Sequence, residues 1–301
     1  MSMEIAELTQ KKFVVTAELG PPKGTNLEPF FKQAGFLKGR VDGANVTDAQ
    51  SALMKMASLG ACRLLKEFGI EPILQMTVRD RNRLALQGEI LAADALGIHN
   101  ILVLTGDPMK IGDHPDAKAV FDVDAGQLIE LIKKLESGVD MTDHKLDGAP
   151  KMCVAAALNP CVEDIETEIS KTRHKIEKGA EFFQTQGVFD LPRFLRFAER
   201  YKKEGFKVPI LAGIILLKSP KMANFMNEKI PGIFIPKPMI ERLEKATGAP
   251  AGGGSASGGK AECVAIASEI IEKVRPHVQG VHLMAIGWEE LIPDILKRAR
   301  L

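Results

Sequence analysis

The feature that most constrains this chain is the regular alternation of short apolar runs with segments of helical periodicity. Eight such runs recur along the 301 residues. They are apolar throughout rather than alternately apolar and polar, which is typical of parallel strands covered on both faces. The runs span 13–17, 43–47, 72–78, 100–105, 152–157, 182–186, 209–215 and 280–286.

Segments with the spacing of amphipathic helices separate these runs. Within 51–68, for example, Leu53, Met56 and Leu64 recur at helical intervals, so that one face is apolar. Several of the segments are followed by a glycine such as Gly69, the residue that most readily ends a helix in the left-handed conformation. The predicted helices span 51–68, 81–96, 124–135, 165–178, 191–203, 239–247, 262–274 and 289–299.

Eight strands that alternate with helices predict an α/β fold, the (β/α)₈ TIM barrel. The alternative is an open doubly wound sheet, but no Gly-x-Gly-x-x-Gly follows the first strand. No sharp linker divides the chain, so we expect one barrel domain over residues 1–301 with a Gly-rich loop at 249–260. Residues 254–260 match Gly-x-x-x-x-Gly-Lys, but a helix precedes them and Ala261 follows, so we do not expect nucleotide hydrolysis.

Charge and cysteine content exclude several classes of protein. Lys and Arg total 40 and Asp and Glu total 39, and this balance argues against a nucleic-acid or anionic-membrane partner. The N-terminus has no secretory signal and no apolar run is long enough to span a bilayer, so we expect a cytoplasmic protein. The four cysteines are widely spaced, which indicates buried, reduced thiols. The six histidines lack a metal-ligand spacing, so we assign no metal.

Polar residues follow several of the predicted strands, where the active site of a barrel lies. Two of them, Glu18 and Asp107, are carboxylic acids on separate strands. Either acid alone could be a helix cap or a surface charge. Two carboxyl groups at one barrel mouth can instead divide into a proton donor and an ionised stabilising group.

A basic strip is predicted on the helix after the fifth strand. Lys171, His174, Lys175 and Lys178 follow one another at positions i, i+3, i+4 and i+7 and therefore share a face. One interpretation is a solvated surface, and the other is a binding strip for a phosphate-bearing cofactor.

Several motifs together resemble the methylenetetrahydrofolate reductase family, in its short bacterial type. The resemblance covers nearly the whole chain, and the pairing of Thr-Gly-Asp-Pro with Thr-Gln-x-x-x-Asp is the most specific part of it. The motifs lie at 17–23 (AELGPPK), 45–48 (NVTD), 77–82 (TVRDRN), 97–108 (GIHNILVLTGDP), 175–180 (KIEKGA) and 185–190 (TQGVFD).

This resemblance implies an oxidoreductase of one-carbon metabolism that reduces 5,10-methylenetetrahydrofolate to 5-methyltetrahydrofolate. It implies Glu18 as the general acid at folate N10 and a reduced flavin as the hydride donor. Asp107 corresponds to the catalytic partner that holds the pterin, and Gln186 to a second substrate contact. The implied acid must be protonated near neutral pH, so we expect burial to raise the pKa of Glu18.

The resemblance also implies the cofactor and its contacts. FAD is the expected flavin, with FMN as the alternative. Matching positions for the flavin are Thr47, Gln75, Thr105, Gly106, Ala157, Glu168, Lys171, His174 and Lys175.

Some positions depart from the family pattern around the expected nicotinamide site. The loop 216–220 lacks a ring-stacking Phe, and 286–288 lacks an Asn-Arg pair. The electron donor is therefore expected to be NADH, NADPH or an electron-donating partner subunit, in a homo-oligomer or a hetero-complex.

Two other functions remain open from the sequence. One is a non-redox subunit that binds tetrahydrofolates or takes part in methyl transfer. The other is an aldolase or lyase barrel, which would need a lysine at a strand end, where Lys218 is the near candidate.

Overall fold

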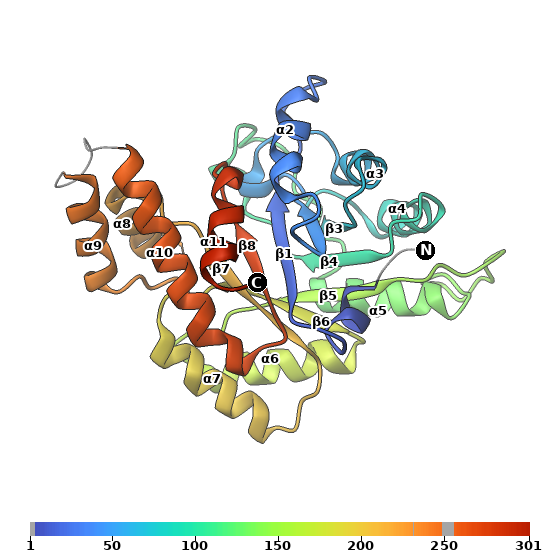
Figure 1. The fold of residues 1–301 in the computed structure, drawn as a ribbon. Helices are drawn as coiled ribbons and strands as arrows, with labels where there is room; N and C mark the ends of the chain where they lie inside the picture. The colour runs from blue at the N-terminus through green and yellow to red at the C-terminus, as the bar shows by residue number, and fades with distance from the viewer. Residues whose placement is uncertain (1–3, 231, 249–255) are drawn as a thin grey trace.

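The computed structural model describes residues 4–230, 232–248 and 256–301, and it confirms the predicted (β/α)₈ barrel (Figure 1). Eight parallel strands pair in chain order, and β1 pairs with β8 to close the barrel. All eight predicted runs form strands. Their bounds are β1 Val14–Leu19, β2 Gly43–Val46, β3 Pro72–Thr77, β4 Asn100–Leu104, β5 Cys153–Leu158, β6 Phe182–Gly187, β7 Ile210–Ile215 and β8 Gly280–Met284.

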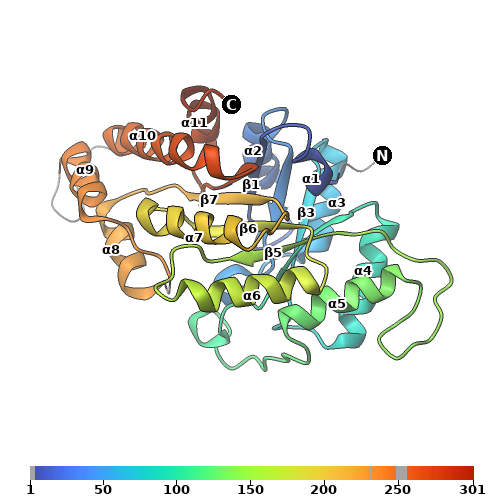
Figure 2. The same ribbon diagram turned by 90° about the horizontal axis from the view of Figure 1, so that it is seen from below.

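Helices surround the strands and pack their apolar faces on the outside of the barrel. Single helices connect consecutive strands from β1 to β7, whereas α8, α9 and α10 lie together between β7 and β8 (Figure 1). Figure 2 shows α6 and α7 side by side across β5 to β7. The bounds are α2 Glu28–Leu37, α3 Ser58–Phe68, α4 Arg83–Ala95, α5 Ala125–Glu136, α6 Ile165–Glu177, α7 Leu191–Lys203, α8 Pro220–Lys229, α9 Lys237–Thr247, α10 Ala256–Val274 and α11 Ile292–Arg298.

A short helix, α1 (Ile5–Leu8), closes the end of the barrel where the strands begin. The Ile5 side chain is buried in one cluster with Val14 and Phe182, which point into the barrel. The backbone N–H of Ile5 donates to Asn100 Oδ1 at 2.9 Å, so this buried donor is satisfied. The barrel is therefore sealed and apolar at this end, and the functional cavity lies at the other.

Several helix boundaries differ from the sequence prediction. The predicted helix at 51–68 begins only at Ser58, because a 3₁₀ turn (Gln50–Ala52) and an extended segment precede it. The predicted helix at 289–299 likewise begins at Ile292, after a 3₁₀ turn. The helices α1, α2 and α8 were not predicted, since they are short or weakly periodic.

The Gly-rich loop predicted at 249–260 is partly wrong. Residues 256–260 are the first residues of α10, and 249–255 lie outside the described residues. The structure shows why glycine is used at this helix start. A Cβ added to Gly258 would lie 2.2 Å from the carbonyl oxygen of Ala246 in α9, so the two helices can approach only because Gly258 has no side chain.

The cysteine prediction is confirmed, since Cys62, Cys153, Cys161 and Cys263 are all free and buried. Over the described ranges, none of the helices has the length and apolar character needed to cross a bilayer.

Candidate active site

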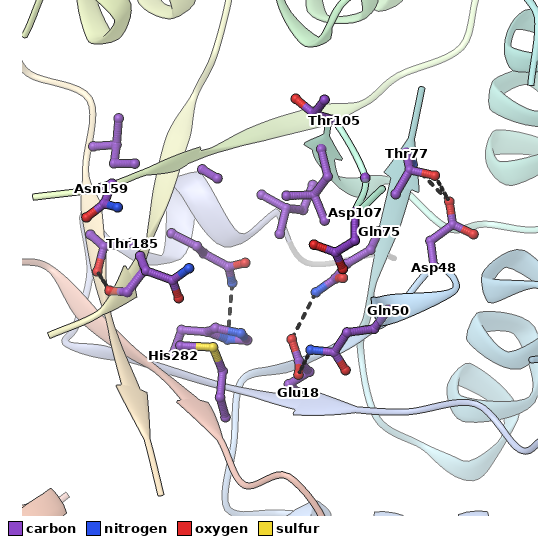
Figure 3. A pocket seen from close by; sticks show the side chains of 18 of the residues that line it. Glu18, Asp48, Gln50, Gln75, Thr77, Thr105, Asp107, Asn159, Thr185 and His282 are labelled. Atoms are coloured by element: carbon purple, nitrogen blue, oxygen red, sulfur yellow. Dashed lines mark hydrogen bonds between the residues drawn. The ribbon is translucent and has the colours of Figure 1, made fainter. Parts of the chain in front are cut away.

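A cavity of about 680 Å³ opens at the end of the barrel where the strands finish (Figure 3). Its volume is in the range of small-molecule and cofactor sites. The cavity brings together most of the predicted site residues, namely Glu18, Gln75, Thr105, Gly106, Asp107, Ala157, Glu168, Lys171, Lys175 and Gln186. It is also lined by residues to which the sequence assigned no role: Asp48, Gln50, Thr77, Leu102, Leu104, Leu158, Asn159, Gln184, Thr185, His282 and Met284.

Glu18 stands near the end of β1 and its carboxyl group accepts two amide hydrogen bonds (Figure 3). Gln50 Nε2 donates to Oε1 at 3.0 Å, and Gln75 Nε2 donates to Oε2 at 3.4 Å. Burial raises the pKa of Glu18, the two hydrogen bonds lower it, and nearby Glu289 raises it further, with a net upward shift. The shift has the direction that the family resemblance led us to expect for the pKa of Glu18.

Asp107 lies across the cavity mouth, on the segment after β4. Its Oδ2 accepts a hydrogen bond from the backbone N–H of Ser51 at 2.8 Å. Its own backbone carbonyl accepts from the buried guanidinium of Arg79 at 3.1 Å. The preceding Gly106 has φ +93°, and a Cβ there would lie 2.9 Å from Arg79 Cβ, so only glycine allows this turn. The side chain of Asp107 is thus held at the mouth while remaining exposed.

A buried polar layer lies below the carboxyl groups, and sequence reasoning missed it. Gln184 on β6 exchanges hydrogen bonds with Asn45 on β2 at 2.7 and 3.0 Å. The Thr16 hydroxyl lies 3.0 Å from Nδ1 of His282 on β8. Burial lowers the pKa of His282 to about 3, so the imidazole is neutral in the fold. Single polar residues inside otherwise apolar strands were the signal that could have found this layer.

A second unforeseen group is an ion pair beside the cavity. Arg81 binds both carboxylate oxygens of Asp48, at 2.8 and 3.0 Å. The same carboxylate accepts from the backbone N–H and the hydroxyl of Thr77, at 2.8 and 3.0 Å (Figure 3). Because its oxygens are already satisfied, Asp48 serves mainly to fix this side of the cavity.

The predicted basic strip on α6 is divided between two directions. Lys171 and Lys175 line the cavity, and Lys175 Nζ donates to the carbonyl oxygen of Ala157 at 2.6 Å. Burial lowers the pKa of Lys175. His174 and Lys178 turn instead toward α5, where Lys178 pairs with Glu130 at 2.6 Å. Of the four residues of the strip, Lys171 and Lys175 thus line the cavity, whereas His174 and Lys178 do not.

The position of His174 is defined by its neighbour on α5. A Cβ added to Gly126 would lie 3.3 Å from His174 Nε2, and His174 does not line the cavity. Thr47 also lies outside the lining and is buried at the end of β2. Gln186 does line it, and its Oε1 accepts from the backbone N–H of Gly187 at 3.0 Å.

The lining fits the parts of a flavin. Leu102, Leu104 and Ala157 provide apolar surface for a flat ring, while Gln75 and Thr105 add hydrogen-bonding groups. Lys171 provides a cation at the α6 side of the same cavity, where a phosphate group would need one. The donor set agrees with a cofactor that has a flat ring and carries phosphate.

The fold and the cavity define the class of protein as a TIM barrel with a polar site built from strand ends. The family model for methylenetetrahydrofolate reductase matches residues 3–300 of the chain. The chain therefore belongs to the methylenetetrahydrofolate reductase family, as its motifs indicated.

Relatives with this name are distant in sequence. 5,10-Methylenetetrahydrofolate reductase of Pectobacterium carotovorum is 25% identical over 240 residues, which cover 77% of this chain and 74% of that protein. Methylenetetrahydrofolate reductase 1 of Schizosaccharomyces pombe is 23% identical over 238 residues, covering 75% of this chain and 37% of that protein. The chain thus spans little more than a third of the yeast protein's length.

Two solved structures share the fold. One, from Clostridium thermocellum, is described as an uncharacterized protein that binds two copies of 5-methyl-5,6,7,8-tetrahydrofolic acid. It has a TM-score of 0.62 and 16% identity and covers 98% of each chain. The other is EDTA monooxygenase from Chelativorans sp. BNC1, with a TM-score of 0.54 and 12% identity over 96% of this chain and 95% of that one.

Proposed function

We propose that this protein reduces 5,10-methylenetetrahydrofolate to 5-methyltetrahydrofolate with the help of a bound flavin. The observation that carries the proposal is the carboxyl group of Glu18, whose pKa is raised at the mouth of a barrel that belongs to this family. A carboxylic acid that keeps its proton near neutral pH is what ring opening of the substrate requires.

Glu18 acts as the general acid. It donates its proton to N10 of the folate, which breaks the bond between N10 and the bridging methylene carbon and leaves an iminium group at N5. Transfer of a hydride to that carbon then gives the N5-methyl product, so one proton and one hydride balance the reaction. The two amides of Gln50 and Gln75 hold the carboxyl group toward the cavity during proton transfer.

Asp107 and Gln186 are the proposed substrate contacts. Both line the cavity, and Asp107 is held at the mouth by the N–H of Ser51. A carboxylate and an amide are suited to the donor and acceptor groups on a pterin ring. In this arrangement Asp107 orients the substrate and Glu18 transfers the proton, which divides the two acids between two roles.

A bound flavin, with FAD as the first candidate and FMN as the alternative, would supply the hydride after reduction by NADH, NADPH or an electron-donating partner protein. Gln75, Thr105, Gly106 and Ala157 would line its ring and ribityl chain. Glu168, Lys171 and Lys175 would face its ribose and phosphates, with Thr47 and His174 as further proposed contacts from outside the lining.

The optical spectrum tests this proposal. The purified protein, supplied with FAD or FMN if needed, should show flavin absorbance that dithionite bleaches and methylenetetrahydrofolate restores under anaerobic conditions. The Glu18→Gln variant should keep the flavin but recover its colour far more slowly. A protein that takes up neither flavin contradicts the proposal.

A non-redox tetrahydrofolate-binding or methyl-transfer subunit is the second candidate. The Clostridium thermocellum protein of the same fold, which is described as binding 5-methyl-5,6,7,8-tetrahydrofolic acid, favours it. Calorimetric titration with 5-methyltetrahydrofolate separates the two. Binding by a protein that does not accept flavin supports the second candidate.

A further inference from the structure

The segment that follows β2 has an unusual backbone. Ala49, Ser51 and Ala52 have φ values of 45°, 56° and 55°, in the left-handed region, although none of them is glycine. The left-handed region is unfavourable for a residue with a side chain, because its Cβ crowds the following carbonyl oxygen. Strain of this kind persists only where the surroundings hold it, and it is often found at functional sites.

Neighbouring segments hold this backbone in place. Arg79, with 1% of its surface exposed, donates to the carbonyl oxygen of Ala49 at 3.2 Å and to that of Asp107 at 3.1 Å. A Cβ on Gly112 would lie 1.9 Å from the carbonyl oxygen of Ala52, so the segments after β2 and β4 are in close contact. One buried guanidinium thus connects the strained turn to the backbone that carries Asp107.

The same segments are also joined on the outer side of the mouth. Asp113 accepts from the backbone N–H of Met54 at 2.9 Å and pairs with Lys23. The loops after β1, β2 and β4 therefore form one connected assembly above the cavity.

The strained turn presents two adjacent donors to the two acids of the proposed reaction. Gln50 Nε2 donates to Glu18 Oε1 at 3.0 Å, and the next residue, Ser51, donates its backbone N–H to Asp107 Oδ2 at 2.8 Å. Figure 3 shows Gln50 reaching toward Glu18 from the loop side of the cavity. Both donors are presented by the same turn, in which Ala49 and Ser51 have left-handed φ values.

We propose that Gln50 is a positioning residue for Glu18 and that the strained turn 49–52 orients both acids together. The inference rests on the proposed function, because it takes Glu18 as the proton donor. Gln50 makes the shorter of the two hydrogen bonds to Glu18 and fixes Oε1 as an acceptor. The transferable proton is then carried by Oε2, which the longer bond from Gln75 constrains less.

Other charged or titratable groups lie near Glu18 or line the same cavity. Glu289, in the turn after β8, raises the pKa of Glu18, whereas the hydrogen bond from Gln50 lowers it. Asp48, Asp107 and His282 line the same cavity, and Lys171 and Lys175 face it from α6. These groups are unchanged when only the Gln50 amide is removed, so the effect of Gln50 can be isolated.

The test compares Gln50→Met, which keeps length without a donor, with Gln50→Ala. A matched control is Gln10→Met, since Gln10 is exposed in the turn before β1 at the opposite end of the barrel. Infrared titration of the carboxylic-acid C=O band, assigned by its loss in Glu18→Gln, measures the pKa of Glu18 without folate. Both Gln50 variants should raise this pKa further, and Gln10→Met should leave it as it is.

The reaction gives a second readout. Dithionite-reduced enzyme is mixed with methylenetetrahydrofolate in stopped flow across a pH range, so that the natural electron donor is not needed. We expect Gln50→Met and Gln50→Ala to slow reoxidation about tenfold, the effect of one lost orienting hydrogen bond. The alkaline limb of the pH profile should move to higher pH, because the acid keeps its proton longer.

Two results would overturn this inference and leave the proposed function intact. One is an unchanged pKa of Glu18 in both Gln50 variants, and the other is a raised pKa with an unchanged rate profile. If Glu18→Gln itself reoxidises at the native rate, the role of Glu18 in the proposed function fails, which is a different outcome. Gln50 is exposed, so its variants are expected to fold, and circular dichroism checks this.

Discussion

The two ends of the barrel interior are built from the same strands but have opposite character. On β1, Val14, Thr16 and Glu18 point inward in turn because successive inward side chains are two residues apart. Val14 belongs to the apolar seal, Thr16 to the buried polar layer and Glu18 to the cavity. The same change occurs along β6, from Phe182 through Gln184 to Gln186. One end is an apolar seal, and the other holds the proposed catalytic groups.

This comparison shows how polar groups can be buried without leaving a hydrogen-bond donor or acceptor unpaired. In the buried polar layer, donors and acceptors from four strands form hydrogen bonds with one another. The described part of the chain holds no buried side-chain N or O atom without a partner. At the mouth the acids keep part of their hydrogen-bonding capacity for a ligand. Apolar residues below and satisfied polar residues between keep the acids in a rigid frame.

The largest expected effect is at the mouth. Glu18→Gln should lower the rate of folate-dependent reoxidation about 10³-fold, because general-acid catalysis contributes roughly 10²–10⁴-fold. Its melting temperature should be equal to or above that of the native protein at neutral pH, since a buried ionisable group has been removed. Stopped-flow rates and thermal unfolding measure the two quantities. A large loss of stability would mean that the mouth is structural as well.

The next effect is at the sealed end. Phe182→Ala should lower the free energy of unfolding by about 3–5 kcal/mol, as expected for a fully buried aromatic side chain. Urea unfolding measures this value. Phe225→Ala, at an exposed position, serves as the control and should change it by less than about 0.5 kcal/mol. Equal losses in the free energy of unfolding for the two variants would contradict the view that the apolar end of the barrel supplies stability.

The buried polar layer should affect how the free energy of unfolding depends on pH. His282 has a pKa of about 3 in the fold against its usual 6.5. As the pH falls below 6.5, the unfolded chain takes up a proton that the folded chain does not, so the free energy of unfolding decreases toward pH 3.

In His282→Gln this decrease should be shallower, and stability at pH 7 should fall by about 1–2 kcal/mol through altered hydrogen bonds to Thr16 and Gln184. Urea unfolding at a series of pH values measures both. His277→Gln, at an exposed position, is the matched control. An unchanged slope in His282→Gln would show that other groups dominate acid unfolding.

The smallest effect concerns the divided strip on α6. Lys171→Met should weaken flavin binding about tenfold, because a hydrogen bond to a charged group contributes about 1.5 kcal/mol or more. Lys178→Met should change it less than about twofold, since Lys178 turns toward Glu130. Fluorescence titration of the apoprotein with FAD measures both. Equal losses of flavin affinity in the two variants would show that Lys171 and Lys178 belong to one binding face.

Much of this architecture was predictable from local pattern. The eight strands follow from continuous apolar runs, and Glu18 and Asp107 could be placed at one mouth because parallel strands in a barrel end on the same side. The helix at 51–68 was predicted too long, since its apolar spacing continues across Leu53 and Met56 although the backbone there is extended and follows the strained turn 49–52. Contacts with Arg79 and Gly112 override the local periodicity.

The sequence alone determined the barrel, the strand order, the family and the two acids, because these depend on periodicity and on motifs that are continuous along the chain. Only the tertiary structure decided that Gln50 meets Glu18, that Thr16, Asn45, Gln184 and His282 form one layer, and that His174 turns away from the cavity. These relations join residues on different strands, or depend on which neighbour a helix face meets. They are set by closure of the barrel and by the packing of α6 against α5, and no local pattern encodes either.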